Sequence, residues 1–400
     1  MRNSVVIVGS GPVGAVLALG LARHGFGVVL LEAQSTVPDA PRAATMHPST
    51  LEMLGELGLM QQVVEEGLVA RYFDFWDRPT RSLIARFDHD ILRGVTPFPF
   101  VVQLEQHKLV NMALRELATI DNAQVHFDTA VTAVRQDADG ATAIADHDGE
   151  LVEFHGDYVV GADGGRSVVR KSLGIEFVGY TWPERFLVLT TGVDFQADLD
   201  CSFRNYLADP VEWTNLFKVA GDDGKGRWRA VFSVPATTSD EDALGDEAVR
   251  GRLHRLTAND GAMALLEHRN IYKVHQRVAG SVREGRVLLM GDAAHVNNPI
   301  GGLGLNSGIH DATDLIATLT AMGSHYDDDA LGQYGTRRRE LNVEFVQQQT
   351  IANKKRLEET DPEVRKLRQD ELAATVADPE RARRFLLRSS LLDSVRRSRP

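Results

Sequence analysis

Three glycines at G-x-G-x-x-G spacing constrain this chain more than any other feature of its sequence. Gly9, Gly11 and Gly14 follow an apolar run at residues 5–8 and open an apolar stretch with helical spacing at residues 13–24. Strand, glycine turn and helix in this order predict the start of a dinucleotide-binding unit. Gly9 permits the tight turn, Gly11 lets the backbone approach a pyrophosphate, and Gly14 lets helix and strand pack closely.

A second predicted strand, residues 28–31, leads into Glu32 and Ala33. A carboxylate at this position accepts hydrogen bonds from an adenosine ribose and repels a 2′-phosphate. The pair of features therefore predicts a site for FAD or NAD rather than NADP. The alternative is a glycine turn that binds no ligand.

Two later motifs favour FAD over NAD. Asp163 lies in the glycine-rich run 161–167, and Asp292 lies in the run 291–295, which continues through a second glycine-rich stretch at 299–306. Each aspartate follows a predicted strand and stands beside small residues, where it can bond a sugar or ribityl hydroxyl while the glycines expose backbone amides.

These three motifs, in this order, resemble those of the class A flavoprotein monooxygenases, the aromatic hydroxylases typified by para-hydroxybenzoate hydroxylase and 3-(3-hydroxyphenyl)propionate hydroxylase. The resemblance runs from about residue 5 to residue 319. It implies that the glycine turn binds the FAD pyrophosphate, Glu32 the adenosine ribose and Asp292 the ribityl chain. The full set of cofactor-binding residues that it implies is Gly9, Gly11, Pro12, Val13, Gly14, Glu32, Ala33, Arg42, Gln106, Val131, Asp163, Gly164, Gly291, Asp292, Pro299, Gly302, Gly304, Leu305 and Asn306.

The resemblance also implies a reaction. A family member hydroxylates a small phenolic or heteroaromatic acid with NADH or NADPH and O2, through a flavin C4a-hydroperoxide. In the family, the carbonyl of the proline that matches Pro299 accepts the phenol proton, and the segment matching Asp163 also serves the nicotinamide nucleotide. Flavin epoxidases, ring-opening oxygenases and reductases share these motifs, so these reaction types stay open.

The fold class expected is mixed α/β. We expect a Rossmann-like FAD-binding domain in two parts, residues 1–174 with a small β meander and residues 281–333. Between them, residues 175–280 are rich in short alternating apolar runs, which predicts an inserted, mainly antiparallel β domain for the substrate. Residues 334–400 are polar with helical spacing, which predicts a C-terminal helical region. We expect Ser49 and Thr50 to cap the start of one further helix.

The substrate domain offers candidates rather than a signature. Arg204, Tyr206 and Trp213 lie on runs that would face the flavin, which makes them candidates for substrate contact, although ordinary sheet packing is the favoured interpretation of each. His295, close to Asp292, is expected to be a structural partner of the cofactor loop. The run Arg337 to Arg339 is expected to be a solvated helix face.

Composition excludes several classes of protein. Cys201 is the single cysteine, so an internal disulfide cannot form, and we expect it to be a small buried side chain. The formal charge of −12 gives no electrostatic footprint for nucleic acid. No apolar stretch approaches the roughly 20 residues of a membrane helix, and His47, His107 and His310 lack the spacing of a metal site. We therefore expect a cytoplasmic enzyme, monomer or homodimer, that binds neither metal, membrane nor nucleic acid.

Overall fold

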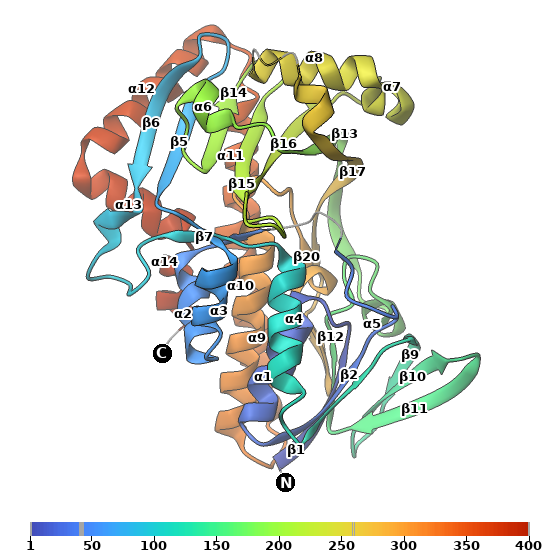
Figure 1. Cartoon of the computed structure of the whole chain (residues 1–400). Coiled ribbons are helices and arrows are strands. Elements are labelled where there is room, and N and C mark those ends of the chain that lie inside the picture. Colours follow the sequence, from blue (N-terminus) through green and yellow to red (C-terminus); the bar gives the residue numbers. More distant parts are fainter. Residues whose placement is uncertain (1, 40–43, 258, 260, 399–400) are drawn as a thin grey trace.

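The computed structural model describes residues 2–39, 44–257, 259 and 261–398. Figure 1 shows two large β-sheets, a parallel sheet in the lower half and a mainly antiparallel sheet in the upper half, with the helices of the C-terminal region along one side. The long strands β13 (Phe177–Thr191) and β17 (Leu266–Ala279) run side by side between the two halves. The expected mixed α/β fold is confirmed.

The parallel sheet has the strand order β18-β19-β12-β1-β2-β8. Its members are β1 (Arg2–Val8), β2 (Phe26–Leu31), β8 (Ala123–His126), β12 (Tyr158–Gly161), β18 (Arg283–Glu284) and β19 (Val287–Leu289). The short β18 joins antiparallel and the other pairs are parallel. Val5 and Ile7 are fully buried, because a parallel sheet is covered on both faces and its strands are continuous apolar runs.

Helices cover one face of this sheet: α1 (Pro12–Arg23), α4 (Gln106–Leu117) and α9 (Leu303–Met322). Gly20 of α1 allows α9 to approach closely, because a Cβ at this position would lie 2.2 Å from Cδ1 of Ile316. The other face is covered by the predicted meander of β9 (Thr129–Gln136), β10 (Ala141–His147) and β11 (Glu150–Gly156). Asp148 and Gly149 turn between β10 and β11 with φ of 54° and 84°, as an Asp-Gly hairpin turn requires.

The antiparallel sheet has the order β20-β17-β13-β16-β15-β14-β5-β6. Its remaining members are β5 (Tyr72–Asp77), β6 (Ser82–Asp88), β14 (Arg204–Ala208), β15 (Thr214–Val219), β16 (Arg227–Val234) and β20 (His295–Val296). One face packs on a core shared with α7 (Asp240–Leu244) and α8 (Asp246–Leu256). The opposite face carries Phe73, Phe75 and Tyr206, which pack with Ile300 and with the C-terminal helices.

The segment expected to belong to the FAD-binding unit alone contributes to both sheets. Strands β5 and β6 come from residues 1–174 but pair in the antiparallel sheet. Their runs of alternating aromatic residues are of the same kind as those after residue 175. The division of the chain at residues 174, 280 and 333 stays a prediction.

Smaller elements lie between the strands of the two large sheets along the chain. They include β3 (Thr45–Met46), β4 (Leu68–Ala70), β7 (Val101–Gln103), α2 (Pro48–Glu56), α3 (Met60–Glu66), α5 (Val168–Ser172) and α6 (Phe195–Leu199). The expected cap of α2 is wrong: His47 is the N-cap residue, and the Ser49 hydroxyl donates instead to the carbonyl of Ser390. Pro48 begins the helix because proline is favoured at the first helical position.

The C-terminal region is helical, as expected. It comprises α10 (Asp328–Leu341), a π-helix at Asn342–Gln347, α11 (Gln348–Leu357), α12 (Pro362–Ala377), α13 (Pro379–Ser389) and α14 (Leu392–Ser398). Leu357, Leu386 and Leu387 pack into the aromatic core on the face of the antiparallel sheet that carries Phe73 and Phe75. Among the described residues, no helix is both long and apolar enough to cross a lipid bilayer.

Candidate active site between the two sheets

The glycine turn after β1 leaves open space where a phosphate would approach. Gly9 has φ of +101°, and a Cβ there would lie 2.6 Å from the carbonyl oxygen of Ala162. A Cβ at Gly14 would lie 2.0 Å from the Gly9 carbonyl oxygen, whereas a Cβ at Gly11 would meet nothing within 4 Å. Gly9 and Gly14 are therefore required by packing, and Gly11 leaves the start of α1 accessible to an anion.

Glu32 stands at the end of β2 beside this turn. Its Oε2 accepts hydrogen bonds from the backbone nitrogen and the hydroxyl of Ser10, at 2.8 and 2.9 Å. Its Oε1 accepts from the backbone nitrogen of Gln34 at 3.0 Å. The carboxylate is thus fixed against the glycine turn, at the position that the ribose prediction requires.

Asp163 has a structural partner that the sequence prediction did not include. Its Oδ1 accepts from the Ser167 hydroxyl at 2.5 Å, and its Oδ2 accepts from the backbone nitrogens of Val168 and Val169 at 2.7 and 3.2 Å. These contacts tie the carboxylate to the N-terminus of α5. The N-cap residue of α5 is Ser167, whose hydroxyl accepts from the backbone nitrogen of Arg170 at 2.9 Å, so a serine before a helix is the signal that the sequence offered.

The third motif joins a 3₁₀ turn at Gly291–Ala293 to the start of α9. Gly291 and Gly302 have φ of +54° and +67°, and a Cβ at Gly302 would lie 2.8 Å from Cβ of Thr45. Asp292 is exposed. The amides of the first turn of α9, Leu305 included, have no carbonyl acceptor within the helix.

The Asn306 side chain is used inside the protein. Its Oδ1 accepts from the backbone nitrogen of His47 at 2.8 Å, and its Nδ2 donates to the carbonyls of Thr45 and Gly302. Asn306 therefore fixes α9 to β3. Its side chain is therefore not available for the flavin contact that the resemblance implies.

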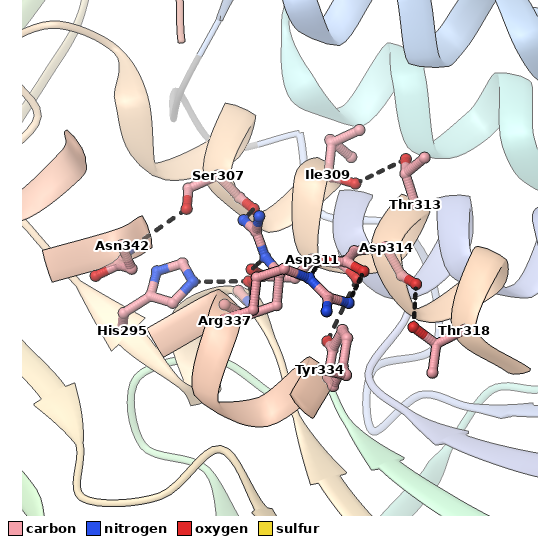
Figure 2. A network of polar contacts seen from close by, with 12 residues as sticks. His295, Ser307, Ile309, Asp311, Thr313, Asp314, Thr318, Tyr334, Arg337 and Asn342 are labelled. Atoms are coloured by element: carbon pink, nitrogen blue, oxygen red, sulfur yellow. Dashed lines mark hydrogen bonds and ion pairs between the residues drawn. The ribbon is translucent and has the colours of Figure 1, made fainter. Parts of the chain in front are cut away.

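A buried ion cluster supports the Asp292 turn from behind. Asp311 of α9 accepts from the backbone nitrogen of Gly291 at 3.0 Å, from Nε2 of His295 at 2.7 Å and from Nε of Arg338 at 2.7 Å. Figure 2 shows His295 pointing at Asp311. Burial opposes ionisation of Asp311, but pairing with His295 and Arg338 prevails and lowers its pKa to about 2.

This cluster agrees with the structural role expected for His295 and corrects the expectation for the arginine run. Arg338 is buried, Arg337 pairs with Asp314, and Arg339 donates to the carbonyl of Ala279. The run is not a solvated face, because Asp311 and Asp314 lie one turn apart on α9 and face α10. The sequence alone could not predict that α9, with its two aspartates, packs against the helix that carries the arginines.

Arg204 of β14 is a buried cation surrounded by aromatic rings. It is 6% exposed, and its guanidinium lies over the ring of Phe73. No described residue accepts a hydrogen bond from this guanidinium or forms an ion pair with it at salt-bridge distance. Burial lowers the pKa of Arg204 to about 10. Burial of a guanidinium without a hydrogen-bond acceptor is costly, and a charge-assisted hydrogen bond to an anion would offset this cost.

Tyr206 and Trp213, the other two candidates for substrate contact, are both buried in aromatic packing. Tyr206 points to the same sheet face as Arg204, and its ring meets those of Phe73 and Phe75 edge-on at 4.9 and 5.4 Å. Burial raises the pKa of Tyr206 to about 12. Trp213 is buried against Phe186 with ring centroids 4.9 Å apart, so it packs the sheet.

The loop at residues 296–302 lies between this aromatic wall and the start of α9. The Pro299 carbonyl accepts from the backbone nitrogen of Gly302 at 3.0 Å, and Pro299 itself is exposed. Ile300 packs into the wall, and Nε2 of His47 hydrogen-bonds the Gly301 carbonyl at 2.8 Å.

The remaining predicted residues are more scattered. Gln106 begins α4, Val131 lies on β9, and both are half-buried. Arg42 lies outside the described residues. Cys201 is buried, burial raises its pKa to about 12, and its thiol is within hydrogen-bond distance of the Phe195 carbonyl. Within the described ranges, no group of three or more His, Cys, Asp or Glu side chains could hold a metal ion.

Comparison with known proteins decides the family. A model of the FAD binding domain matches residues 2–349, most of the chain. The chain belongs to the FAD-binding class A flavoprotein monooxygenases. The open space at Gly11 and the first turn of α9 fit the pyrophosphate and ring that such a flavoprotein must hold.

Full-length relatives of this flavoprotein monooxygenase act on aromatic compounds. The para-nitrophenol 4-monooxygenase of Pseudomonas sp. (strain WBC-3) is 33% identical over 390 residues, 96% of this chain and 94% of the relative. The 6-hydroxy-3-succinoylpyridine 3-monooxygenase of Pseudomonas putida (strain DSM 28022 / S16) is 32% identical over 369 residues, 90% of this chain and 91% of the relative. The crystal structure of p-nitrophenol 4-monooxygenase from Pseudomonas putida DLL-E4 superposes with a TM-score of 0.90 at 30% identity, covering 97% of this chain and 98% of that one. This chain is accordingly an FAD-dependent monooxygenase of aromatic compounds.

Proposed function

We propose that this monooxygenase hydroxylates a small phenolic or heteroaromatic substrate that carries an anionic or strongly hydrogen-bond-accepting group, with NADH or NADPH and O2 as co-substrates. The observation that carries the proposal is the buried, unpaired guanidinium of Arg204 in an aromatic wall beside the loop of Pro299. The substrates named for the two relatives, para-nitrophenol and 6-hydroxy-3-succinoylpyridine, both join a hydroxylated ring to such a group.

Each part of the wall would act on the substrate directly. Arg204 would bind the anionic group, because a charge-assisted hydrogen bond in a dry site is strong. Tyr206 and Phe73 would pack against the ring. The Pro299 carbonyl, in the loop at residues 296–302, would accept the phenol proton and so raise the nucleophilicity of the ring.

The cofactor would lie along the three motifs. FAD supplies hydride acceptance and oxygen activation when it is bound. The amides at the start of α9 would face its pyrimidine edge, where the helix dipole stabilises negative charge. The glycine turn from Gly9 to Gly14 would bind the pyrophosphate, and Glu32 and Ala33 the adenosine ribose. Val131 would contact the adenine and Asp292 the ribityl chain. Further contacts with FAD would come from Gln106, Arg42 and the segment of Asp163 and Gly164.

A panel of nitrophenols, hydroxybenzoates and hydroxypyridine carboxylates tests the proposal. The purified protein should be yellow, and one of these compounds should accelerate NADH or NADPH oxidation. With ¹⁸O2, one labelled oxygen atom should enter the product. Unlabelled reduced product would favour a reductase of the same fold, a labelled epoxide would favour an epoxidase, and a labelled ring-opened product would favour a ring-opening oxygenase. Protein that contains no flavin and cannot be reconstituted with FAD would contradict the proposal.

A further inference from the structure

A chain of buried side-chain amides joins the C-terminal region to the loop at residues 296–302. It begins in the π-helix Asn342–Gln347, between α10 and α11. Single π-helical turns are rare and are frequent at functional sites. Asn342 and Gln347, at the two ends of this turn, are both buried. Nδ2 of Asn342 donates to the Ser307 hydroxyl on α9 at 3.3 Å (Figure 2).

Gln347 carries the chain from the π-helix to the loop. Its Nε2 donates to the Val296 carbonyl at 3.3 Å and to Oδ1 of Asn342 at 3.2 Å. Its Oε1 accepts from Nε2 of Gln276, on β17, at 2.6 Å. Oε1 of Gln276 in turn accepts from the backbone nitrogen and Nδ2 of Asn298, at 3.1 and 3.2 Å. Both glutamines thus use both ends of their amides.

Further side chains hold the rest of the loop. Oδ1 of Asn298 accepts from the backbone nitrogen of Ile300 at 3.1 Å, and Nδ2 of Asn353 on α11 donates to the Ile300 carbonyl at 3.2 Å. His47 holds the next carbonyl, that of Gly301. The irregular backbone on both sides of Pro299 is therefore fixed mainly by side chains. Asn298 and Ile300 are fully buried, while Pro299 between them is exposed.

Stability alone does not require amides here. Replacing both partners of a buried hydrogen bond by apolar groups of the same shape is often nearly neutral for folding. What an apolar pair cannot supply is direction, because hydrogen bonds weaken steeply when their angle changes. A network with satisfied donors and acceptors fixes one arrangement of the backbone.

We propose that Gln276 and Gln347 are positioning residues, which hold the loop at residues 296–302 so that the Pro299 carbonyl meets the substrate hydroxyl in one fixed geometry. The proposal rests on the proposed function for the role of Pro299. It gives the C-terminal region a part in the reaction: the π-helix and α11 set the position of the active-site loop from outside the cofactor-binding unit.

The test compares four FAD-loaded proteins: wild type, Gln347→Leu, the double variant Gln276→Leu/Gln347→Leu, and Gln348→Leu. Gln348 is the matched control because it is adjacent in sequence but exposed. Amide hydrogen exchange measures the peptide covering residues 296–302. Turnover assays measure the KM for the aromatic substrate and the coupling, which is the hydroxylated product formed per NAD(P)H consumed. Urea unfolding measures stability.

In Gln347→Leu, the loop amides should exchange about tenfold faster, as expected for the loss of the hydrogen bond that Gln347 makes directly to the loop, at the Val296 carbonyl. Product per NAD(P)H should fall by about tenfold, because small displacements of a reacting group are costly, while the KM for the aromatic substrate stays within about twofold. The double variant should lose at least as much stability and product yield as Gln347→Leu, because it also leaves the backbone nitrogen and Nδ2 of Asn298 without their acceptor. Gln348→Leu should match wild type in all three measurements.

Unchanged loop exchange in both leucine variants would overturn the proposal, and so would a loosened loop with full product yield. If the leucine variants fail to fold, Asn353→Ala, which releases the Ile300 carbonyl, decides the question. If no aromatic compound stimulates the wild type, the proposed function fails, whereas the exchange measurement still tests whether the glutamines hold the loop.

Discussion

The guanidinium carbon of Arg204 lies 4.6 Å from the centroid of the Phe73 ring. A ring face offers an arginine a modest attraction, about 2 kcal/mol when both are desolvated. That attraction is smaller than the several kcal/mol that an ion loses when it leaves water. The contact with Phe73 therefore does not by itself compensate the burial of the Arg204 charge, and under the proposed function the anionic group of the substrate would do so.

Replacing Arg204 with methionine should separate binding from folding. Arg204→Met removes an unpaired buried charge, so the free energy of unfolding of the substrate-free protein should stay the same or rise. The KM for the aromatic substrate should rise by about 10- to 100-fold, the usual effect of losing a charged hydrogen bond. Urea unfolding and stimulated NAD(P)H oxidation measure the two quantities.

Arg86 provides the matched control. It forms two hydrogen bonds of 2.9 Å to the buried carboxylate of Asp74. Arg86→Met should therefore lower stability and leave the KM unchanged. If Arg204→Met instead behaves like Arg86→Met, with lower stability and an ordinary KM, Arg204 is a packing residue.

The aspartates of the second and third motifs should respond differently to alanine. Asp292→Ala should weaken FAD binding by about 10- to 100-fold, because it removes an acceptor for a ribityl hydroxyl. Asp163→Ala should lower the free energy of unfolding by about 1 kcal/mol or more, because it removes the acceptor that holds the start of α5. Flavin fluorescence titration and urea unfolding distinguish the two effects. Unaltered FAD affinity in Asp292→Ala would refute the ribityl assignment.

The sequence predicted the parts of this site that depend on local spacing. The turn from Gly9 to Gly14 and the acid at Glu32 are fixed by neighbours within about 20 residues, and both lie where expected. The burial of Arg338 could not be predicted from local spacing, because it depends on pairing with Asp311, a residue on another helix. The role of Asp163 was incomplete for a related reason: one carboxylate pattern suits both a ribose and a helix cap.

The Asp311 cluster should matter for both stability and cofactor. Asp311→Ala leaves Arg338 buried without its counter-charge, which costs about 3–5 kcal/mol, and it releases the amide of Gly291 beside Asp292. Asp314→Ala is the control, because Asp314 lies on the same helix but pairs with the partly exposed Arg337, where an ion pair contributes about 1 kcal/mol or less. The temperature of thermal unfolding and the FAD content of the purified protein should both fall clearly further in Asp311→Ala than in Asp314→Ala. Equal effects would show that the cluster has no special connection to the cofactor turn.

Buried neutral histidines should make the fold sensitive to acid. Burial, together with the charge of Arg204, lowers the pKa of His89 to about 3, and burial and Arg338 lower that of His310 to about 3. The pKa of His47 is also lowered well below its usual value, chiefly by burial. Between about pH 6.5 and pH 3, the unfolded chain binds protons at the positions of His89 and His310 and the folded protein does not. The free energy of unfolding should thus fall with decreasing pH in this window, by about 1.4 kcal/mol per pH unit for each of these two histidines, and His47 adds to the fall in the same direction.

His89→Asn isolates one of these contributions. Nδ1 of His89 hydrogen-bonds the Arg71 carbonyl at 2.8 Å, and an asparagine amide can take over this donation without titrating. The slope of unfolding free energy against pH, measured in urea between pH 4.5 and pH 6.5, should decrease by about 1.4 kcal/mol per pH unit relative to wild type. A wild-type slope in His89→Asn would mean that His89 is also protonated in the folded protein over this pH range, which would contradict the prediction.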